Sequence, residues 1–277
     1  MAIHQLSQAR RLALRSRRWN SVLLIVIALP MLLFVLLPLL SLLIRTRPMT
    51  LVDNLLDSTV MQAVGLSLMS STLATLLAVV VGTPLAYLLA RCHFRGRSLI
   101  ETLTELPMVL PPAVAGVALL MAFGRQGVVG SYLSSLGVDI AFSQTAVILA
   151  QLFVAAPFYV KSAITGLSRI EQEVEQAAAI DGARPLGVFW YVTLPLAWPA
   201  LFGGAVMTWA RALGEFGATI IFAGNFPGRT QTMPLAIYIG FEIELDMALT
   251  LAVILLTTSF VVLVVIKGVL RQRVGSI

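Results

Sequence analysis

The fold class is decided by residues 58–90, an uncharged stretch with the sequence STVMQAVGLSLMSSTLATLLAVVVGTPLAYLLA. An α-helix rises about 1.5 Å per residue, so about 20 apolar residues cross the roughly 30 Å hydrocarbon core of a bilayer. Residues 58–90 are long enough to cross that core with several residues to spare. Residues 20–44 form a second uncharged run of spanning length. Both runs predict transmembrane helices.

The composition of the whole chain excludes a water-soluble domain. Of its 277 residues, 58% are hydrophobic and only 12% are charged, whereas about 25% of the residues in soluble proteins are charged. One cysteine, Cys92, and two histidines, His4 and His93, give no metal-ligand cluster. The sequence therefore predicts no metal site, no cofactor and no catalytic residue. The net charge of +6 comes from basic residues beside apolar runs, which indicates membrane topology and not nucleic-acid binding.

Six apolar runs predict an all-α integral membrane protein with six transmembrane helices. The runs are residues 20–44, 58–90, 106–124, 145–159, 196–223 and 247–266. Six spans place both termini on one side, and 14 of the 19 Lys and Arg residues fall on that side. Because cytoplasmic loops carry the excess of basic residues, both termini are predicted to be cytoplasmic.

Three regions follow from this topology. They are a basic cytoplasmic segment (residues 1–20), a transmembrane domain (21–266) that includes a cytoplasmic loop (163–196), and a cytoplasmic tail (267–277). The external loops are too short to enclose a domain, and the phosphate-binding pattern G-x-x-x-x-G-K-[ST] does not occur. Substrate capture and nucleotide hydrolysis are therefore expected on other chains, and this chain is not expected to be an enzyme.

Two of the runs contain residues that are unusual inside a membrane. Pro111 and Pro112 interrupt the third run, and the fifth carries Arg211 and Glu215 at i, i+4 spacing. An unpaired charge in a membrane helix costs about 2.5 to 3.5 kcal/mol, so these two side chains are expected to pair. Two interpretations stay open for each pair. Arg211 and Glu215 either line a translocation path or form a purely structural ion pair. Pro111 and Pro112 mark either a gate or a simple kink. Four glycines of the fifth run predict close helix approach: Gly203, Gly204, Gly214 and Gly217.

The loop at residues 163–196 contains helix signals of its own. Ser168 and Glu171 have the spacing of a capping box, Gly182 supplies a helix stop, and Pro185 can open a second helix. Leu194-Pro195 is expected to begin the fifth span. The loop is thus predicted to be a helical hairpin, which either docks into a partner protein or lies at the membrane interface without one.

The loop also contains a spaced motif. Gln176-Ala177-Ala178 is followed after three residues by Gly182, and after nine more by Val192-Thr193-Leu194-Pro195. This spacing resembles the EAA loop of ABC importer permeases, whose pattern is E-A-A, three residues, G, nine residues, I-x-L-P. Gln176 stands at the glutamate position with Glu175 just before it, and Val192 stands at the isoleucine position. Both departures leave the turn glycine and the proline in place.

Two further segments resemble the molybdate/tungstate and sulfate/thiosulfate branch of this family. They are LPMVLPPAVAG at residues 106–116 and ARALGEFGAT at residues 210–219. The PGRTQT run at residues 227–232 and the LAIY run at 235–238 are more similar to molybdate permeases than to sulfate ones. The whole resemblance covers residues 60–265 and implies a type I ABC importer permease fold.

The resemblance implies the permease subunit of an ATP-driven importer, which forms the pathway for a tetrahedral oxyanion, molybdate or tungstate, in a prokaryotic cell (inner or plasma) membrane. The implied partners are two ABC ATPase subunits, a second copy of the chain, an external or periplasmic substrate-binding protein and membrane lipid. In that family the EAA loop seats in a cleft of the ATPase, which assigns docking to Glu175, Gln176, Ala177, Ala178, Asp181, Gly182, Leu194 and Pro195. The translocation path or gate is assigned to Pro111, Pro112, Arg211 and Glu215.

Two alternative functions stay open on the sequence. The first is a sulfate/thiosulfate permease of the same family. The second is an ion-coupled secondary transporter, in which Glu215 would carry the coupling proton near the middle of the membrane. A third class, a channel or a scaffold that only assembles helices, is disfavoured because it would leave the capped loop without a role.

Overall fold

The computed structural model describes residues 2–55 and 57–274, with side-chain surroundings for 24–55, 57–265 and 268. Every regular element in these residues is a helix, which confirms the predicted all-α class. The chain divides into two compact units, one ending at Leu51 and the other beginning at Val52.

The first unit contains one long helix and the start of the next. These helices are α1 (Ala2–Arg45) and α2 (Pro48–Leu55). The apolar part of α1, Leu24–Arg45, is long enough to span a membrane, which confirms the helix predicted at residues 20–44. The basic segment before it is helical as well.

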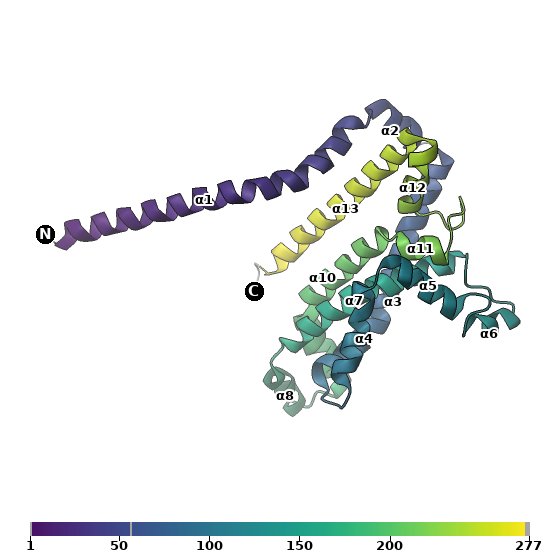
Figure 1. Ribbon diagram of the computed structural model, residues 1–277. Coiled ribbons are helices and arrows are strands. Elements are labelled where there is room, and N and C mark those ends of the chain that lie inside the picture. The colour runs from purple at the N-terminus through teal and green to yellow at the C-terminus, as the bar shows by residue number, and fades with distance from the viewer. Residues whose placement is uncertain (1, 56, 275–277) are drawn as a thin grey trace. The chain divides into compact units, whose positions relative to one another are not determined.

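Three long helices form the centre of the second unit (Figure 1). They are α3 (Ser58–Arg91), α7 (Gln144–Ser168) and α10 (Leu194–Leu213), and α7 packs against both of the others. Glycines allow the close approach: a Cβ atom on Gly204 would lie 2.7 Å from the Cβ of Ser162, and one on Gly82 would lie 3.0 Å from the Tyr159 ring. Small residues commonly mediate such contacts between membrane helices.

The predicted third span is broken sharply at its prolines. It consists of two helices, α4 (Arg97–Val109) and α5 (Pro112–Phe123), which are bent by 116° at the break. Pro111 disfavours helical backbone at the residue before it, and Leu110 is accordingly extended, with a ψ of 136°. The predicted interruption is confirmed. The helix starts earlier than residue 106, however, because Pro107 is accommodated inside α4.

The predicted fifth span was wrong at its beginning. A continuous helical segment comprises α9 (Pro185–Val188), the π turn η1 (Phe189–Thr193) and α10. The segment therefore runs through Pro195 and does not begin there. Proline lacks an N–H group, so an ordinary α-helical hydrogen bond is missing at this point. The preceding π turn, in which the Leu194 N–H donates to the Phe189 carbonyl, adds one residue to the helical path.

The same span was also wrong at its end. α10 ends at Leu213, and the chain resumes as a short helix, α11 (Gly217–Phe222). Gly214 is a weak helix former, and the carboxylate of Glu215 accepts a hydrogen bond of 2.9 Å from the Ala218 N–H. This local bond favours a new helical start over continuation of α10.

Three other predicted boundaries differ from the structure. α7 continues to Ser168, well past the predicted end at residue 159. Ser168 is therefore the last residue of α7 and makes no capping box with Glu171, which precedes α8 (Gln172–Ile180) without a side-chain cap. The final span lies inside the longer α13 (Leu245–Val274), which pairs with a helix that the sequence analysis did not separate, α12 (Met233–Ile243).

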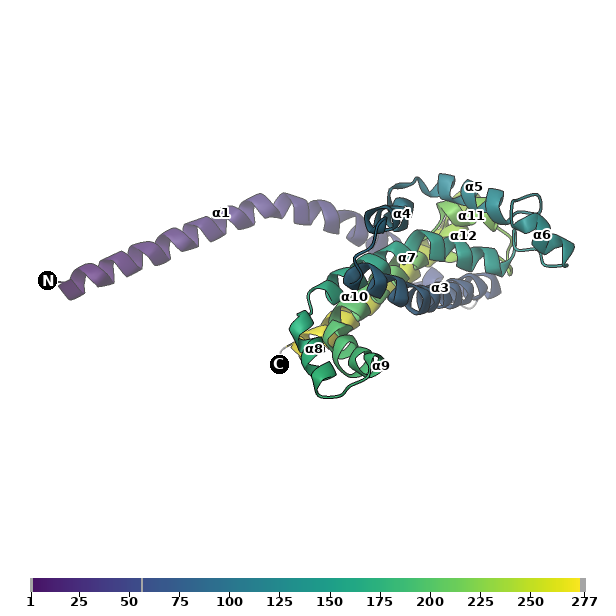
Figure 2. The same ribbon diagram turned by 90° about the horizontal axis from the view of Figure 1, so that it is seen from below.

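Five helices are long and apolar enough to span a membrane, and the bent α4–α5 pair gives six if it counts as one span. The remaining short helix is α6 (Gly130–Ser135). Figure 2 shows α8 and α9 at one end of the second unit, with α5, α6 and α11 at the other. The two groups of predicted site residues thus lie at opposite ends of the helical bundle.

Candidate functional site

The α8 loop, residues 169–193, carries the residues predicted to dock to a partner. Its helix ends at Gly182, whose φ of +92° is a left-handed conformation that favours glycine. The Ala183 N–H reaches back to the Ala178 carbonyl at 3.0 Å, and the Gly182 N–H donates to the Ala179 carbonyl at 3.1 Å. This is the hydrogen bonding of a glycine-terminated helix end. The predicted helix stop at Gly182 is confirmed.

Most of the predicted docking residues on α8 face outward. Gln176, Ala177 and Asp181 are exposed, and Ala178 is half-buried. Ile180, on the same short helix, is 85% exposed, although it was not singled out from the sequence. An exposed isoleucine beside small alanines gives a narrow apolar surface that suits a groove on another protein.

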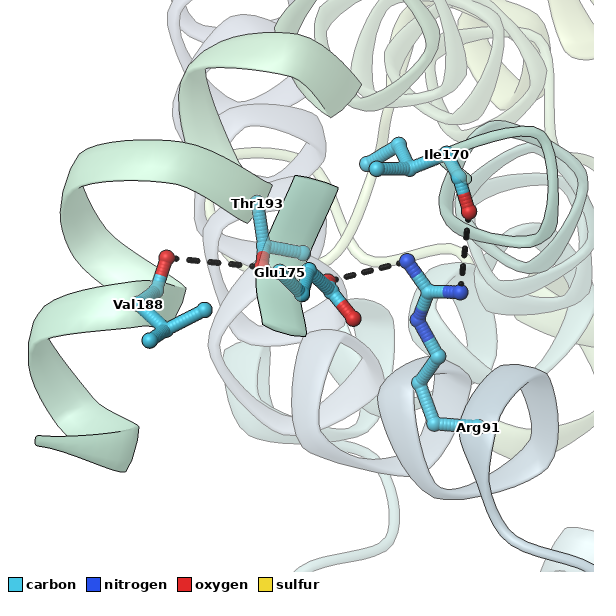
Figure 3. Close-up of polar contacts among 5 residues, drawn as sticks. All are labelled: Arg91, Ile170, Glu175, Val188 and Thr193. Atoms are coloured by element: carbon cyan, nitrogen blue, oxygen red, sulfur yellow. Dashed lines mark hydrogen bonds and ion pairs between the residues drawn. The ribbon is translucent and has the colours of Figure 1, made fainter. Parts of the chain in front are cut away.

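Glu175 faces the rest of the chain instead (Figure 3). Its carboxylate lies 2.9 Å from Nη2 of Arg91, and the two side chains are only 16% and 10% exposed. The same carboxylate oxygen accepts a hydrogen bond of 2.6 Å from the buried Thr193 hydroxyl. Arg91 also donates through Nη1 to the Ile170 carbonyl at 3.1 Å. Sequence reasoning assigned Arg91 to topology alone, because its partner is 84 residues away in the chain.

The remaining two docking candidates lie at the start of α10. Leu194 is half-buried and Pro195 is exposed. They follow the π turn directly, so they belong to the same continuous helical segment as Thr193.

The second candidate region is the junction of the broken helices, formed by the α4–α5 break and the α10–α11 break. A Cβ atom on Gly217 would lie 2.7 Å from the Cβ of Pro112. The break that begins α5 at Pro112 and the break that precedes α11 at Gly217 are therefore in contact, although they are distant in the sequence. Pro111 and Pro112 are both exposed.

Arg211 and Glu215 form the predicted pair at this junction. Nη1 of Arg211 lies 2.6 Å from Oε2 of Glu215, without the alignment of a hydrogen bond. The Arg211 side chain is 29% exposed, whereas that of Glu215 is fully buried. The prediction that they pair is confirmed, although Glu215 lies in the break and not inside a helix.

Three further polar side chains in the surrounding helices were missed by sequence reasoning. Gln151 of α7, Thr208 of α10 and Thr219 of α11 are fully buried, and within the described residues their polar atoms have no hydrogen-bond partner. Because buried polar groups are normally satisfied, these three side chains are unusual in the interior of a helical bundle. Isolated Gln and Thr residues in an apolar run give no signal in a sequence.

The four glycines predicted to permit close approach behave differently. Gly204 and Gly217 lie against other helices, as predicted. Among the residues that the structure describes, a Cβ atom on Gly203 would meet nothing within 4 Å, and one on Gly214 would meet only a carbonyl of its own helix. The prediction is therefore wrong for Gly203 and Gly214. Composition alone does not distinguish a glycine that faces a neighbour from one that faces outward.

A groove of 860 Å³ lies between these two regions, along α7 and α10. Its polar lining includes Lys161, Ser162, Thr165 and Arg169, and Lys161 pairs with Glu105 at 2.8 Å. Within the described residues, no three His, Cys, Asp or Glu side chains are grouped as a metal site would require. The groove thus offers hydroxyl and basic groups together with the carboxylate of Glu171, but within the described residues no grouped ligand set for a cation.

The fold defined by these helices is that of an ABC importer permease, which confirms the predicted type I permease fold. A crystal structure of a bacterial alginate ABC transporter in complex with an alginate-bound periplasmic protein contains a similar chain, with a TM-score of 0.71 at 18% identity. The match covers 90% of this chain and 94% of that one. At this level of identity the likeness establishes the fold alone.

The sequence comparison establishes the family. Residues 82–275 match the family described as binding-protein-dependent transport system inner membrane component. The chain belongs to this family, and it is accordingly a multi-pass protein of the inner membrane. The predicted membership of the ABC importer permeases is thereby confirmed.

Two named relatives represent the two substrate branches that the sequence suggested. The molybdenum transport system permease protein ModB of Mycobacterium tuberculosis is 44% identical over 211 residues, which cover 76% of this chain and 79% of the relative. The sulfate transport system permease protein CysW of Synechococcus elongatus is 36% identical over 226 residues, which cover 81% and 78%. The similarity is greater to the molybdenum permease.

Proposed function

We propose that this chain is the transmembrane permease subunit of an ATP-driven importer for a tetrahedral oxyanion, with molybdate or tungstate as the substrate. The observation that carries this proposal is the 44% identity with a molybdenum permease across most of both chains. Sulfate or thiosulfate is the second candidate, because the similarity to a sulfate permease extends over 81% of the chain.

The permease works with other chains in this proposal. Two ATPase subunits hydrolyse ATP, an external binding protein delivers the anion, and a second copy of the chain completes the pathway. The exposed residues Gln176 and Ala177 of α8 and Asp181 at its end, beside the half-buried Ala178, support docking to the ATPase. Gly182 ends this helix, and Leu194 and Pro195 follow it at the base of α10.

The topology of the proposal places both termini and the α8 loop in the cytoplasm. The basic residues support this orientation, because 14 of 19 fall on the side of the termini. Residues 1–20 and 267–277 are then cytoplasmic segments on either side of the membrane domain.

The proposed translocation path runs past the junction of the broken helices. Broken helices at membrane depth require protein or water to satisfy the freed backbone groups. Pro111 and Pro112 lie at one of the two breaks and Arg211 and Glu215 beside the other, and the close approach of Gly217 to Pro112 brings the two breaks together. Arg211 is already paired with Glu215 and therefore attracts an anion only weakly. Weak binding suits a site that the transported anion must leave.

The proposal is tested with purified permease, ATPase and binding protein reconstituted in liposomes. We expect molybdate uptake that requires ATP and that a hundredfold excess of sulfate leaves unchanged. Sulfate uptake that molybdate does not inhibit would assign the chain to the second branch. Uptake driven by a proton gradient without ATP would contradict the proposal and favour an ion-coupled transporter.

A further inference from the structure

α8 is held to the rest of the chain mainly by polar contacts. None of its residues is fully buried, so apolar packing contributes little to fixing its position. Within the described residues, the side-chain hydrogen bonds and ion pairs from α8 to other elements are those of Glu175. The side-chain polar contacts of α8 with other elements therefore all pass through this one carboxylate.

A single oxygen atom of Glu175 joins two long helices. Oε1 accepts from Arg91 at the end of α3, at 2.9 Å, and from Thr193 at the base of α10, at 2.6 Å. Figure 3 shows the carboxylate between these two donors. Movement of α8 consequently pulls on both helices at once.

Arg91 makes the contact directional. Its two terminal nitrogens reach different acceptors, the Glu175 carboxylate and the Ile170 carbonyl beside the end of α7. The planar guanidinium fixes these two bonds relative to each other, which a lysine ammonium group does not. Since both charged side chains are mostly buried, solvent and salt screen the pair less than a surface pair.

Thr193 is brought to the carboxylate by the π turn. It is the last residue of η1 and is fully buried, and its hydroxyl also lies 3.4 Å from the Val188 carbonyl (Figure 3). A π turn inserts one extra residue and rotates the side chains that follow, and such turns are frequent at functional sites. The turn that accommodates Pro195 thus also orients the Thr193 hydroxyl.

We propose that Arg91, Glu175 and Thr193 form a joint that transmits the movement of α8 to α3 and α10 during the transport cycle. The inference rests on the proposed docking of α8 to the ATPase and specifies what happens after docking. Glu175 is then a positioning residue inside the permease and not a contact to the ATPase, in contrast to its assignment from the sequence. Arg91 and Thr193 are positioning residues of the same joint.

The test uses the complete transporter in liposomes and measures three quantities: ATPase bound per permease, ATP hydrolysed and anion imported. The variants are Glu175→Gln, Arg91→Lys and Thr193→Val. The matched control is Glu105→Gln, which removes the exposed pair with Lys161 and leaves α8 untouched. We expect all variants to bind the ATPase within about twofold of wild type, with anion imported per ATP about five- to tenfold lower for Glu175→Gln and Arg91→Lys. The control should match wild type.

Thr193→Val and one additional variant, a charge exchange, separate the joint from a folding defect. Thr193→Val keeps the shape of the side chain and removes only the hydroxyl, so it should reach the membrane and lower the import per ATP by a smaller factor. Exchange of the charges in Arg91→Glu with Glu175→Arg should recover more import per ATP than either reversal alone.

Several outcomes would overturn the proposal. One is import per ATP at the wild-type level in Glu175→Gln, Arg91→Lys and Thr193→Val. Another is loss of ATPase binding in proportion to transport, which would make Glu175 a docking contact. In both cases the wild-type complex still transports, so the proposed function stands. A wild-type chain that binds no ATPase would contradict the proposed function and the joint with it.

Discussion

Gly217 lies directly against Pro112, so that the breaks in two helices meet at one point. A Cβ atom on Gly217 would lie 2.7 Å from the Cβ of Pro112, closer than two carbon atoms approach without a shift. One turn further on, a Cβ atom on Gly116 would lie 2.9 Å from the Ala218 carbonyl oxygen and from the Cβ of Ile221. Two glycines, one on each helix, thus allow α5 and α11 to pack against each other beside the Arg211–Glu215 pair.

This contact predicts that Gly217→Ala destabilises the protein. The added methyl group meets Pro112, which is fixed by its ring, and the first backbone atoms of α5. Overpacking of this kind costs about 1 to 3 kcal/mol. We expect a lower thermal unfolding temperature of the purified permease in detergent.

Gly203→Ala is the matched control for this substitution. It adds the same methyl group in α10, where nothing lies within 4 Å of the new atom, and alanine also favours the helix. Its unfolding temperature should equal or exceed that of wild type. Equal unfolding temperatures for the two variants would show that α5 and α11 are not tightly packed.

The sequence predicts the spans of this protein because their signals are local. Long uncharged runs mark α3 and α13, and the left-handed turn at Gly182 needs only glycine after a short polar helix. The pairing of Arg211 with Glu215 follows from helical spacing and the cost of an isolated charge. Each of these features is specified within about one turn of helix or by total apolar length.

The remaining features depend on contacts between distant residues. Arg91 meets Glu175 only because the fold brings the end of α3 against α8, 84 residues further along the chain. The π turn before Pro195 lies in a run of apolar and aromatic residues that gives no local sign of it, and the charges beside Gly214 indicate a pair without indicating that the helix breaks there. The resemblance to the EAA loop singled out Glu175 because it directly precedes Gln176 at the glutamate position. The direction of the Glu175 side chain, however, is set by tertiary packing.

The proposed topology predicts which exposed residues react with a reagent that does not cross the membrane. Single cysteines are introduced by Arg125→Cys, Arg229→Cys and Arg184→Cys in a Cys92→Ser background, because Cys92 is itself exposed. All three arginines are exposed in the structure, so a lack of labelling reports the side of the membrane and not burial. In intact cells we expect labelling at 125 and 229 and none at 184. Labelling at 184 from outside would contradict the six-span topology.

The end of α8 predicts a specific requirement at Gly182. Gly182→Ala places a side chain at a φ of +92°, and a left-handed conformation costs about 1 to 2 kcal/mol for residues with a Cβ atom. The helix end should shift and copurification with the ATPase should fall several-fold. Gly182→Asn should be milder, since asparagine adopts this conformation more readily.

Gly187→Ala provides the comparison in the same loop. Its φ is not positive, and the nearest atom to an added Cβ is 4.0 Å away. This variant should bind the ATPase as wild type does. If Gly182→Ala also binds normally, the geometry of the α8 end has no role in docking.

The final prediction concerns the unequal burial of Arg211 and Glu215. Arg211→Gln leaves a fully buried carboxylate without a counter-charge, and breaking a buried pair in this way costs about 3 to 5 kcal/mol. Glu215→Gln leaves an arginine that is 29% exposed and retains an oxygen for the Ala218 N–H. Thermal unfolding in detergent should therefore show a larger loss for Arg211→Gln than for Glu215→Gln.

The double variant separates a structural pair from a pathway site, because the two roles respond differently when both charges are gone. A purely structural pair predicts that Arg211→Gln with Glu215→Gln regains much of the stability and of the uptake lost in the single variants. For the proposed pathway site, the double variant should be stable and yet slow, since the positive potential that draws an anion has been removed. Unfolding temperature and uptake rate on both singles and the double form a double-mutant cycle. Wild-type values for all three variants in both assays would remove Arg211 and Glu215 from the translocation path.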